Sequence, residues 1–221
     1  MLFFLDTANL EEVKKASAWG IVDGVTTNPS LIAREGNPTE DQVRRICGLI
    51  DGDVSAEVIA TGAEDMMREG RKLAAIHKNV VVKVPMTRDG IRACSILSKE
   101  GIRMNVTLCF SAAQAILAAK AGAYIVSPFA GRLDDIGVPG MELISGTVSI
   151  YKTHAFATKV LAASLRSPLH LIEAAKAGAH IATLPLKMLE MLFDHPLTGK
   201  GLEQFLKDYE QAFQPAEAAS R

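Results

Sequence analysis

The chain lacks an excess of charge of either sign. Its 24 lysine and arginine residues nearly balance 25 aspartate and glutamate residues, which leaves a formal net charge of -1. Proteins that bind nucleic acid or an anionic membrane surface usually carry a basic patch and a basic overall balance. We therefore expect neither partner, and the composition favours a small molecule or another protein.

Cysteine and long apolar runs are also scarce. Cys47, Cys94 and Cys109 are odd in number and form no CxxC pair of the kind found in zinc sites and redox motifs. The opening MLFFLDTANL has only four apolar residues between Met1 and Asp6, too few for a signal peptide, and no later run reaches the length of a membrane span. These features predict a protein of the reducing cytoplasm.

Two motifs of common enzyme classes are missing. No GxGxxG follows a predicted strand, which argues against a Rossmann-type dehydrogenase. The five histidines show no HExxH or similar spacing, and His77, His170 and His195 are expected in helices or loops. Metal ligands can converge from distant positions, so a metal-dependent aldolase or isomerase remains an alternative.

Eight short apolar runs alternate with segments of helical periodicity. A length of 221 residues suits one α/β domain, and strand–helix alternation predicts parallel pairing of the strands. Eight such units predict a closed (β/α)8 barrel, the TIM barrel. The runs are LFFLD (2–6), GIVDGVTTN (20–28), VSAEV (54–58), VVVKV (80–84), GIRMNVTL (101–108), AYIVSPF (123–129), KVLAAS (159–164) and HIATLP (180–185).

Helices are expected between these runs at 63–78, 89–99, 111–120 and 168–176. A further helix at the C-terminal end is predicted from about Leu202 to Phe213, with Phe205, Leu206 and Tyr209 on the same apolar face. No stretch rich in proline, glycine or serine divides the chain. We expect one domain over residues 1–213, including this helix, and a flexible tail over 214–221.

Polar side chains fall at or near the end of every apolar run except the last. In barrels of this kind catalytic residues come from the C-terminal ends of the strands. A single polar residue there usually caps the next helix, but seven such positions together predict a functional rim. They are Asp6, Thr27 with Asn28, Glu57, Lys83, Asn105 with Thr107, Ser127, and Ser164 with Arg166 just beyond.

Lys83 stands inside a run of valines that is typical of a central strand buried on both faces. Lysine is rarely buried unless it is paired or functional. Burial disfavours the charged form of an amine, so a buried lysine can become a nucleophile toward a ketone or aldehyde. The alternative is a lysine at a strand end whose stem reaches water. Glu57 and Asp6 on the same rim favour catalysis, because iminium chemistry needs groups that manage water and accept a proton.

Seven motifs resemble the transaldolase family, specifically its small single-barrel branch that also includes the fructose 6-phosphate aldolases. They are FLDTAN (4–9), GVTTNPSL (24–31), SAEV (55–58), VVVKVP (80–85), NVTLCFS (105–111), SPFAGRLDD (127–135) and ASLRSP (163–168). The resemblance covers residues 4–168 in order, and TTNPS and SPFAGR are its most specific parts.

The resemblance implies a TIM barrel in which Lys83 forms a Schiff base with a ketose phosphate. Asp6 would be the acid/base at the C4 hydroxyl, and Glu57 with Thr107 would position the water exchanged during imine formation. No metal and no organic cofactor is implied, and the C-terminal helix would build a homo-oligomer, a pentamer or decamer. The implied substrate-binding residues are Asn28, Asn105 and Ser127 around the dihydroxyacetone unit, Arg132, Ser164 and Arg166 around the phosphate, and also Thr27 and Phe129.

Two positions bear on the choice between transfer and simple cleavage. In this branch transaldolases carry Glu and Phe where the aldolases carry Gln and Tyr, and this sequence has Glu57 and Phe129. A tyrosine hydroxyl beside the iminium can orient a hydrolytic water, whereas phenylalanine offers no hydrogen bond. The sequence therefore predicts a transaldolase of the pentose phosphate pathway, with fructose 6-phosphate aldolase as the alternative. A phosphosugar-binding barrel without catalysis would leave Lys83 unexplained.

The expected donor is sedoheptulose 7-phosphate or fructose 6-phosphate. The expected acceptor is glyceraldehyde 3-phosphate or erythrose 4-phosphate. A dihydroxyacetone unit passes between them.

Overall fold

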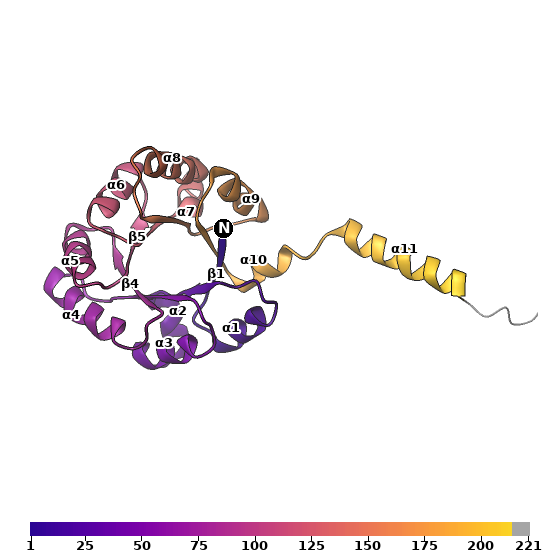
Figure 1. The fold of residues 1–221 in the computed structure, drawn as a ribbon, viewed down its shortest axis with the longest axis horizontal. Helices are drawn as coiled ribbons and strands as arrows, with labels where there is room; N and C mark the ends of the chain where they lie inside the picture. Colours follow the sequence, from indigo (N-terminus) through magenta and orange to yellow (C-terminus); the bar gives the residue numbers. More distant parts are fainter. Residues whose placement is uncertain (214–221) are drawn as a thin grey trace, which may run out of the picture.

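Eight parallel strands form a closed barrel in chain order in the computed structural model, which describes residues 1–213 (Figure 1). The first strand pairs with both the second and the last, and this closes the ring. The predicted (β/α)8 barrel is confirmed. The strands are β1 (Leu2–Asp6), β2 (Gly24–Thr26), β3 (Asp53–Glu57), β4 (Val80–Pro85), β5 (Met104–Cys109), β6 (Ile125–Pro128), β7 (Lys159–Ala162) and β8 (Ile181–Leu184).

A ring of helices surrounds the barrel, and an additional helix follows at the C-terminal end (Figure 1). The helices are α1 (Leu10–Ser17), α2 (Pro29–Glu35), α3 (Thr39–Cys47), α4 (Ala63–Ala74), α5 (Arg88–Lys99), α6 (Ala112–Lys120), α7 (Ala130–Asp134), α8 (Gly140–Thr153), α9 (Pro168–Ala177), α10 (Leu186–Met191) and α11 (Pro196–Phe213). The predicted flexible tail, 214–221, lies outside the described residues.

Helix α4 ends earlier than the predicted 63–78. The chain leaves the helix after Ala74 because it must turn to enter β4. In that turn a ring nitrogen of His77 accepts a hydrogen bond from the backbone N–H of Asn79. The helices predicted at 89–99, 111–120 and 168–176 agree with α5, α6 and α9 to within one residue at each end. The C-terminal helix ends at Phe213 as predicted but begins earlier, at Pro196.

Side chains alternate between the inside of the barrel and the surrounding helices. The outward residues join the large core between strands and helices, as Val80, Val82 and Val84 of β4 do. The inward residues form a separate small cluster across the barrel. Its buried members are Phe4, Val81, Ile125, Leu161, Ala163 and Ile181. This alternation decides which residues can reach the pocket at the C-terminal ends of the strands.

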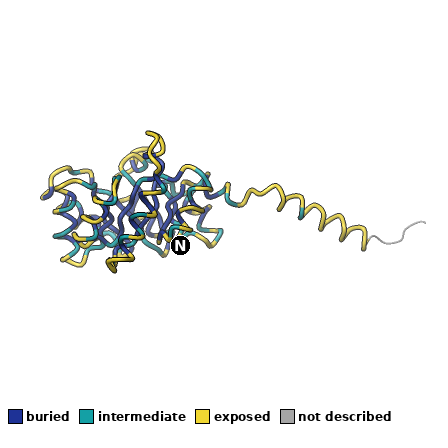
Figure 2. The backbone as a smooth tube through the Cα atoms, turned by 90° about the horizontal axis from the view of Figure 1, so that it is seen from above, coloured by how far each residue is buried: buried dark blue, intermediate teal, exposed yellow. Residues whose placement is uncertain are grey.

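Helix α11 extends away from the barrel (Figures 1 and 2). None of its residues is buried, and Figure 2 shows it exposed along almost its whole length. Its apolar side chains include Leu202, Phe205, Leu206, Tyr209 and Phe213, each 56–72% exposed. The predicted apolar face therefore exists, but it does not cover the barrel of its own chain. No helix within residues 1–213 is long and apolar enough to cross a membrane.

Candidate active site

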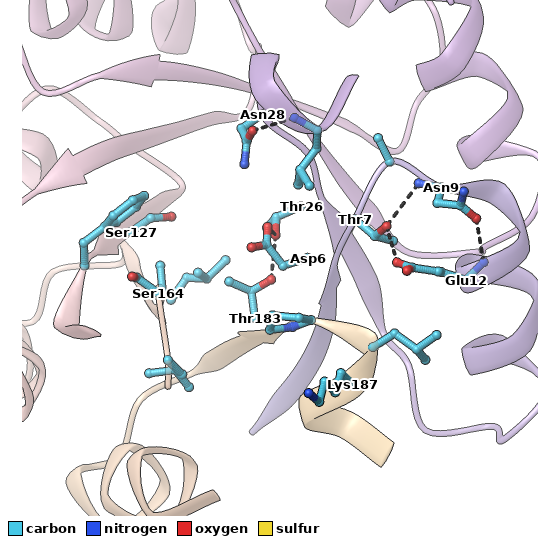
Figure 3. A pocket seen from close by; sticks show the side chains of 18 of the residues that line it. Asp6, Thr7, Asn9, Glu12, Thr26, Asn28, Ser127, Ser164, Thr183 and Lys187 are labelled. Atoms are coloured by element: carbon cyan, nitrogen blue, oxygen red, sulfur yellow. Dashed lines mark hydrogen bonds between the residues drawn. The ribbon is translucent and has the colours of Figure 1, made fainter. Parts of the chain in front are cut away.

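A cavity of about 620 Å³ opens at the C-terminal ends of the strands (Figure 3). Most of the residues predicted for the site converge on it. Those that line it are Asp6, Asn28, Lys83, Ser127, Phe129, Arg132, Ser164 and Arg166. Four predicted residues do not line it: Thr27, Glu57, Asn105 and Thr107.

The alternation of side chains along each strand explains this layer of polar groups. Asp6 stands two residues after the inward-facing Phe4, and Lys83 stands two residues after Val81. Ser127 follows Ile125 in the same way. Because successive inward positions rise by two residues, the apolar layer is followed directly by a polar layer. The strand register therefore assembles the site before any loop contributes to it.

Lys83 is buried, with 5% of its surface exposed. Its Nζ donates a 3.0 Å hydrogen bond to the backbone carbonyl oxygen of Thr27 and forms an ion pair with Oε2 of Glu57, also at 3.0 Å. Glu57 is the register partner of Lys83 on the adjacent strand, so the pairing is set by the sheet. The amine is thus held between two acceptors, and the carboxylate beside it can take a proton from it.

Glu57 contacts Lys83 and lines a second, smaller cavity of about 250 Å³. Thr39 of α3 and Glu69 of α4 also line this cavity. Glu69 accepts hydrogen bonds from the backbone N–H groups of Ile59 and Ala60, which follow Glu57 in the chain. The connection from β3 to α4 is therefore fixed directly behind the Lys83–Glu57 pair.

Asp6 lies across the pocket from Ser127 and Ser164 (Figure 3). Its Oδ1 accepts a hydrogen bond of 2.8 Å from the hydroxyl of Thr26, whose oxygen is 2.5 Å from the hydroxyl oxygen of Thr183. Burial raises the pKa of Asp6 above its ordinary value, and the positive charge of Lys83 and the hydrogen bond from Thr26 oppose that rise in part. This carboxyl group can therefore exchange a proton more readily than a solvated aspartate at neutral pH.

A buried polar chain joins β3, β5 and β6 through Asn105, the register partner of Lys83. The amide of Asn105 donates to the hydroxyl of Ser55, and its oxygen accepts a 2.7 Å hydrogen bond from the hydroxyl of Ser127. Asn105 is completely buried, which is why it supports the pocket rather than lining it. Thr107 is also fully buried, and its hydroxyl has no hydrogen-bond partner within residues 1–213.

Two arginines stand on the side of the pocket formed by β6 and β7. The guanidinium carbon of Arg132 lies 4.9 Å from the ring centre of Phe129, and Arg166 forms a 2.6 Å ion pair with Asp135. Ser164, just after β7, adopts a left-handed backbone conformation with φ 58°, which is uncommon for a non-glycine residue. Strained residues of this kind occur preferentially at ligand sites.

Gly131 allows these two segments to approach each other. A Cβ atom at this position would lie 1.9 Å from the backbone oxygen of Ser164 and 2.9 Å from the guanidinium Nε of Arg166. The approach to the backbone oxygen is too short for any side chain. The glycine of the SPFAGR motif therefore lets α7 pack against the turn that presents Ser164 and Arg166.

Several pocket residues were not predicted from the sequence. The expectation that the last run brings no polar group was wrong, because Thr183 of β8 lines the pocket. Thr183 stands two residues after the inward-facing Ile181, so the alternation could have identified it. The alternation of side chains also points Thr26, and not Thr27, into the pocket. The hydroxyl of Thr27 instead donates to the backbone oxygen of Ser55.

Further unpredicted residues lie at the outer edge of the pocket. Thr7, Asn9, Glu12, Arg34, Glu35 and Lys187 also line it. They belong to the loop after β1 and to helices α1, α2 and α10, where no strand register places a side chain. Asn28, in contrast, was predicted and has a second task, since its side chain caps α2 by accepting from the backbone N–H of Leu31.

The histidines do not form a metal site in the described part of the chain. No group of three or more His, Cys, Asp or Glu side chains within residues 1–213 is arranged to hold a metal ion. His170 instead lies near Asp134, with 3.6 Å between Nε2 and Oδ2, and accepts a hydrogen bond from the backbone N–H of Arg166. It supports the turn that carries this arginine.

A comparison with known families accounts for this arrangement of residues. The family model described as Transaldolase/Fructose-6-phosphate aldolase matches residues 3–219. The chain belongs to this family. The protein is therefore an enzyme, and both the resemblance noted in the sequence and the expectation of an enzyme are confirmed.

Relatives within the transaldolase/fructose-6-phosphate aldolase family are similar over nearly their whole length. A probable transaldolase of Caldicellulosiruptor saccharolyticus is 59% identical, with 96% of this chain and 98% of that protein covered. One of Desulfatibacillum aliphaticivorans is 58% identical, with 96% and 99% covered. One of Methanococcus maripaludis is 57% identical, with 95% and 98% covered.

Proposed function

We propose that this enzyme is a transaldolase that transfers a dihydroxyacetone unit between sugar phosphates through a Schiff base on Lys83. The observation that carries the proposal is the buried amine of Lys83, which lies 3.0 Å from the carboxylate of Glu57 in a pocket that Asp6 also lines. An amine nucleophile, a nearby proton acceptor and a second carboxyl group are the parts that this chemistry requires.

The first half of the reaction cleaves the donor, sedoheptulose 7-phosphate or fructose 6-phosphate. Lys83 loses a proton, for which Glu57 is the adjacent acceptor, and attacks the C2 carbonyl carbon to give a carbinolamine. Loss of water gives the iminium. Asp6 then takes the proton of the C4 hydroxyl, the C3–C4 bond breaks, and its electron pair moves toward the iminium to form an enamine. The aldose phosphate leaves.

The second half reverses these steps with a different aldehyde. The enamine carbon attacks the aldehyde carbon of glyceraldehyde 3-phosphate or erythrose 4-phosphate, and Asp6 returns its proton to the new alkoxide. Water then hydrolyses the iminium and frees Lys83. We assign Thr107 a role in positioning this water, because its buried hydroxyl has no hydrogen-bond partner within residues 1–213. Such an unpaired hydroxyl is costly unless it binds a water or ligand.

Binding roles follow from position in the pocket. Ser127, held by Asn105, and Asn28 stand where they can hydrogen-bond the hydroxyls of the dihydroxyacetone unit. Thr27 contributes its backbone oxygen to Lys83. Arg132, Ser164 and Arg166 form the proposed phosphate site, since guanidinium groups match phosphate oxygens and TIM barrels often bind phosphate near their last strands.

Transfer is favoured over aldol cleavage by the residue at position 129. The ring of Phe129 lies under Arg132 and edge-on to Phe110, with ring centres 5.7 Å apart. It offers no hydroxyl that could orient a water toward the iminium. An aldehyde acceptor then competes better with water for the intermediate. Fructose 6-phosphate aldolase activity, with release of free dihydroxyacetone, is the alternative.

The wider setting of the enzyme is also part of the proposal. We place it in the cytoplasm, which agrees with three free, buried cysteines, and in the non-oxidative pentose phosphate pathway, acting without metal or organic cofactor. The exposed apolar face of α11 supports a homo-oligomer, a pentamer or decamer, in which this helix covers another copy. Full activity after treatment with EDTA is expected, and its loss would revive a metal-dependent mechanism.

The deciding experiment is reductive trapping. The protein is incubated with fructose 6-phosphate, reduced with borohydride, and digested for peptide mass spectrometry. A dihydroxyacetone-sized adduct on Lys83 is expected, and Lys83→Met should abolish both adduct and activity. Lys159→Met is the matched control, because Lys159 is a partly buried lysine at the opposite end of a barrel strand and contacts Tyr124 instead of the pocket. An active enzyme without an adduct would refute the Schiff base.

A further inference from the structure

Two threonine hydroxyls form a hydrogen-bonded chain that ends at the carboxylate of Asp6 (Figure 3). Thr26 and Thr183 stand on β2 and β8, the two strands that flank β1. The oxygen of Thr26 is 2.8 Å from Oδ1 of Asp6 and 2.5 Å from the oxygen of Thr183. Both threonines are nearly inaccessible, at 2% and 4% exposure. The chain thus links the last strand of the barrel to a carboxylate on the first.

The number of available protons fixes the direction of this chain. Each hydroxyl has one proton to donate, and an ionised carboxylate can only accept. Thr26 therefore gives its proton to Asp6, and Thr183 must be the donor in the bond between the two threonines. Hydrogen bonds that point the same way polarise one another, so the bond from Thr183 strengthens the bond from Thr26 to the carboxylate.

We propose that Thr183 is a positioning residue for the reaction: its hydroxyl orients the hydroxyl of Thr26 toward Asp6 and so keeps this carboxylate ionised and correctly aimed for proton transfer. The inference rests on the proposed function, in which Asp6 is the acid/base. No hydrogen bond joins Thr183 to Asp6 within residues 1–213, and Thr183 acts through Thr26.

The burial of Asp6 explains why such support is needed. Loss of solvation raises the pKa of this carboxyl, and the only hydrogen bond it receives from a side chain within residues 1–213 comes from Thr26. Without the bond from Thr183, the Thr26 hydroxyl is free to rotate and donate elsewhere. The ionised form of Asp6 then loses stabilisation, its pKa rises further, and a larger share of the enzyme holds a protonated, inactive base at the acid side of the pH profile.

Other charged groups also face Asp6, but a substitution at Thr183 leaves all of them in place. Lys83 opposes the rise in the pKa of Asp6 from the barrel interior, with Glu57 paired behind it. The remaining charged residues around the same pocket are Glu12, Arg34, Glu35, Arg132, Arg166 and Lys187. A comparison between the wild type and a Thr183 variant therefore isolates the contribution of the hydroxyl.

The experiment compares Thr183→Val, which has nearly the same shape without a hydroxyl, with Thr183→Ser, which restores one. For Thr183→Val we expect kcat at the acid end of the profile to fall about 3- to 10-fold and the acid limb to move up by about half to one pH unit, with KM little changed. Thr183→Ser should return the limb toward its wild-type position. Thr147→Val is the matched control, because Thr147 is a fully buried threonine on α8 whose hydroxyl has no partner within residues 1–213.

A second readout does not depend on turnover. Infrared spectra recorded across pH, with Asp6→Asn to assign the band, follow protonation of the Asp6 carboxyl directly, and its pKa should be higher in Thr183→Val. An unchanged infrared titration and an unchanged acid limb would overturn the proposal. If infrared titration shifts but Lys83 cannot be trapped, the proposed function fails while the hydrogen-bond chain stands. If Thr183→Val does not fold, Thr183→Cys, with its weak donor, replaces it, and a wild-type acid limb there would equally overturn the proposal.

Discussion

The amine of Lys83 lies 3.0 Å from a carboxylate oxygen of Glu57, its partner in the strand register. Both side chains are largely removed from water, at 6% and 12% exposure. A buried charge is tolerated when it is paired and hydrogen-bonded, and removing one partner leaves the other uncompensated. The sheet therefore stabilises the lysine in the apolar interior and at the same time places a proton acceptor beside it.

Glu57→Gln tests the second of these roles. An amide cannot take the proton that Lys83 must lose, so we expect formation of the Schiff base to slow by about 10-fold or more. The rate of borohydride-trapped adduct on Lys83 measures this step. Glu100→Gln is the control, because Glu100 also pairs with a cation, Arg71, but on the exposed outer helices. Equal trapping rates in Glu57→Gln and the wild type would remove Glu57 from the mechanism.

The choice between transfer and cleavage is tested by combining Glu57→Gln with Phe129→Tyr. The new hydroxyl can orient water toward the iminium, so we expect increased release of free dihydroxyacetone from fructose 6-phosphate and decreased transfer to an aldose phosphate. A coupled assay for dihydroxyacetone measures the ratio. Phe156→Tyr is the control, since Phe156 packs against Tyr151 outside the pocket. No increase in dihydroxyacetone would mean that position 129 does not decide the fate of the intermediate.

Much of the barrel could be predicted from the sequence, because its signals are local. The alternation of apolar runs with helical segments is visible without tertiary information, and so is a lysine among valines. Strand limits were predicted less well: the run 20–28 contains only the three-residue β2 (Gly24–Thr26). Residues outside the strands, such as Arg34 of α2 and Lys187 of α10, could not be placed, because their position depends on how these helices pack over the pocket.

The errors within the strands have a different cause. Thr27 was selected because it ends an apolar run, yet the inward position belongs to Thr26. Thr183 was missed because it stands inside a run and not at its end. In both cases the inward-facing residue is found by counting in steps of two from an inward apolar residue such as Phe4 or Ile181. The position at which the apolar run ends does not identify it.

Arg166→Lys tests the phosphate site. Lysine keeps the charge but loses the planar fork that binds two phosphate oxygens, so we expect KM for glyceraldehyde 3-phosphate to rise about 10-fold, a loss of about 1.4 kcal/mol. The KM for unphosphorylated glyceraldehyde should not change. Arg71→Lys is the control, since Arg71 makes a two-pronged pair with Glu100 far from the cavity. Equal effects on both aldehydes would place the phosphate elsewhere.

The apolar face of α11 is tested with Phe205→Glu. Phe205 is 72% exposed on a helix with no buried residue, so a charge there costs little within the chain but disrupts an interface with another copy. We expect a fall in mass by light scattering, as for deletion of residues 200–221. Gln204→Glu is the control. It adds the same charge to the same helix, but at a polar residue whose side chain hydrogen-bonds Asp208. An unchanged mass in Phe205→Glu would exclude this face from assembly.

Asp6→Asn is expected to abolish activity and yet stabilise the protein at neutral pH. Burial raises the pKa of Asp6 in the folded state, so the folded protein binds this proton more tightly than the unfolded chain. The resulting stabilisation is fully present below the unfolded pKa and is lost as the pH rises through the folded pKa. At neutral pH the buried carboxylate therefore costs stability, and asparagine removes the charge while its carbonyl oxygen can still accept from Thr26.

We expect the melting temperature of Asp6→Asn at neutral pH to rise by about 2–4 °C, or about 1 kcal/mol. The advantage should shrink on acidification and disappear below about pH 3.9, the ordinary pKa of aspartate, because the wild-type carboxyl is then neutral in both states. Asp41→Asn, at an exposed residue paired with Arg44, should show no such gain. If Asp6→Asn melts lower than the wild type at neutral pH, the attraction between Asp6 and Lys83 outweighs the loss of solvation. The buried carboxylate then stabilises the folded protein instead of destabilising it.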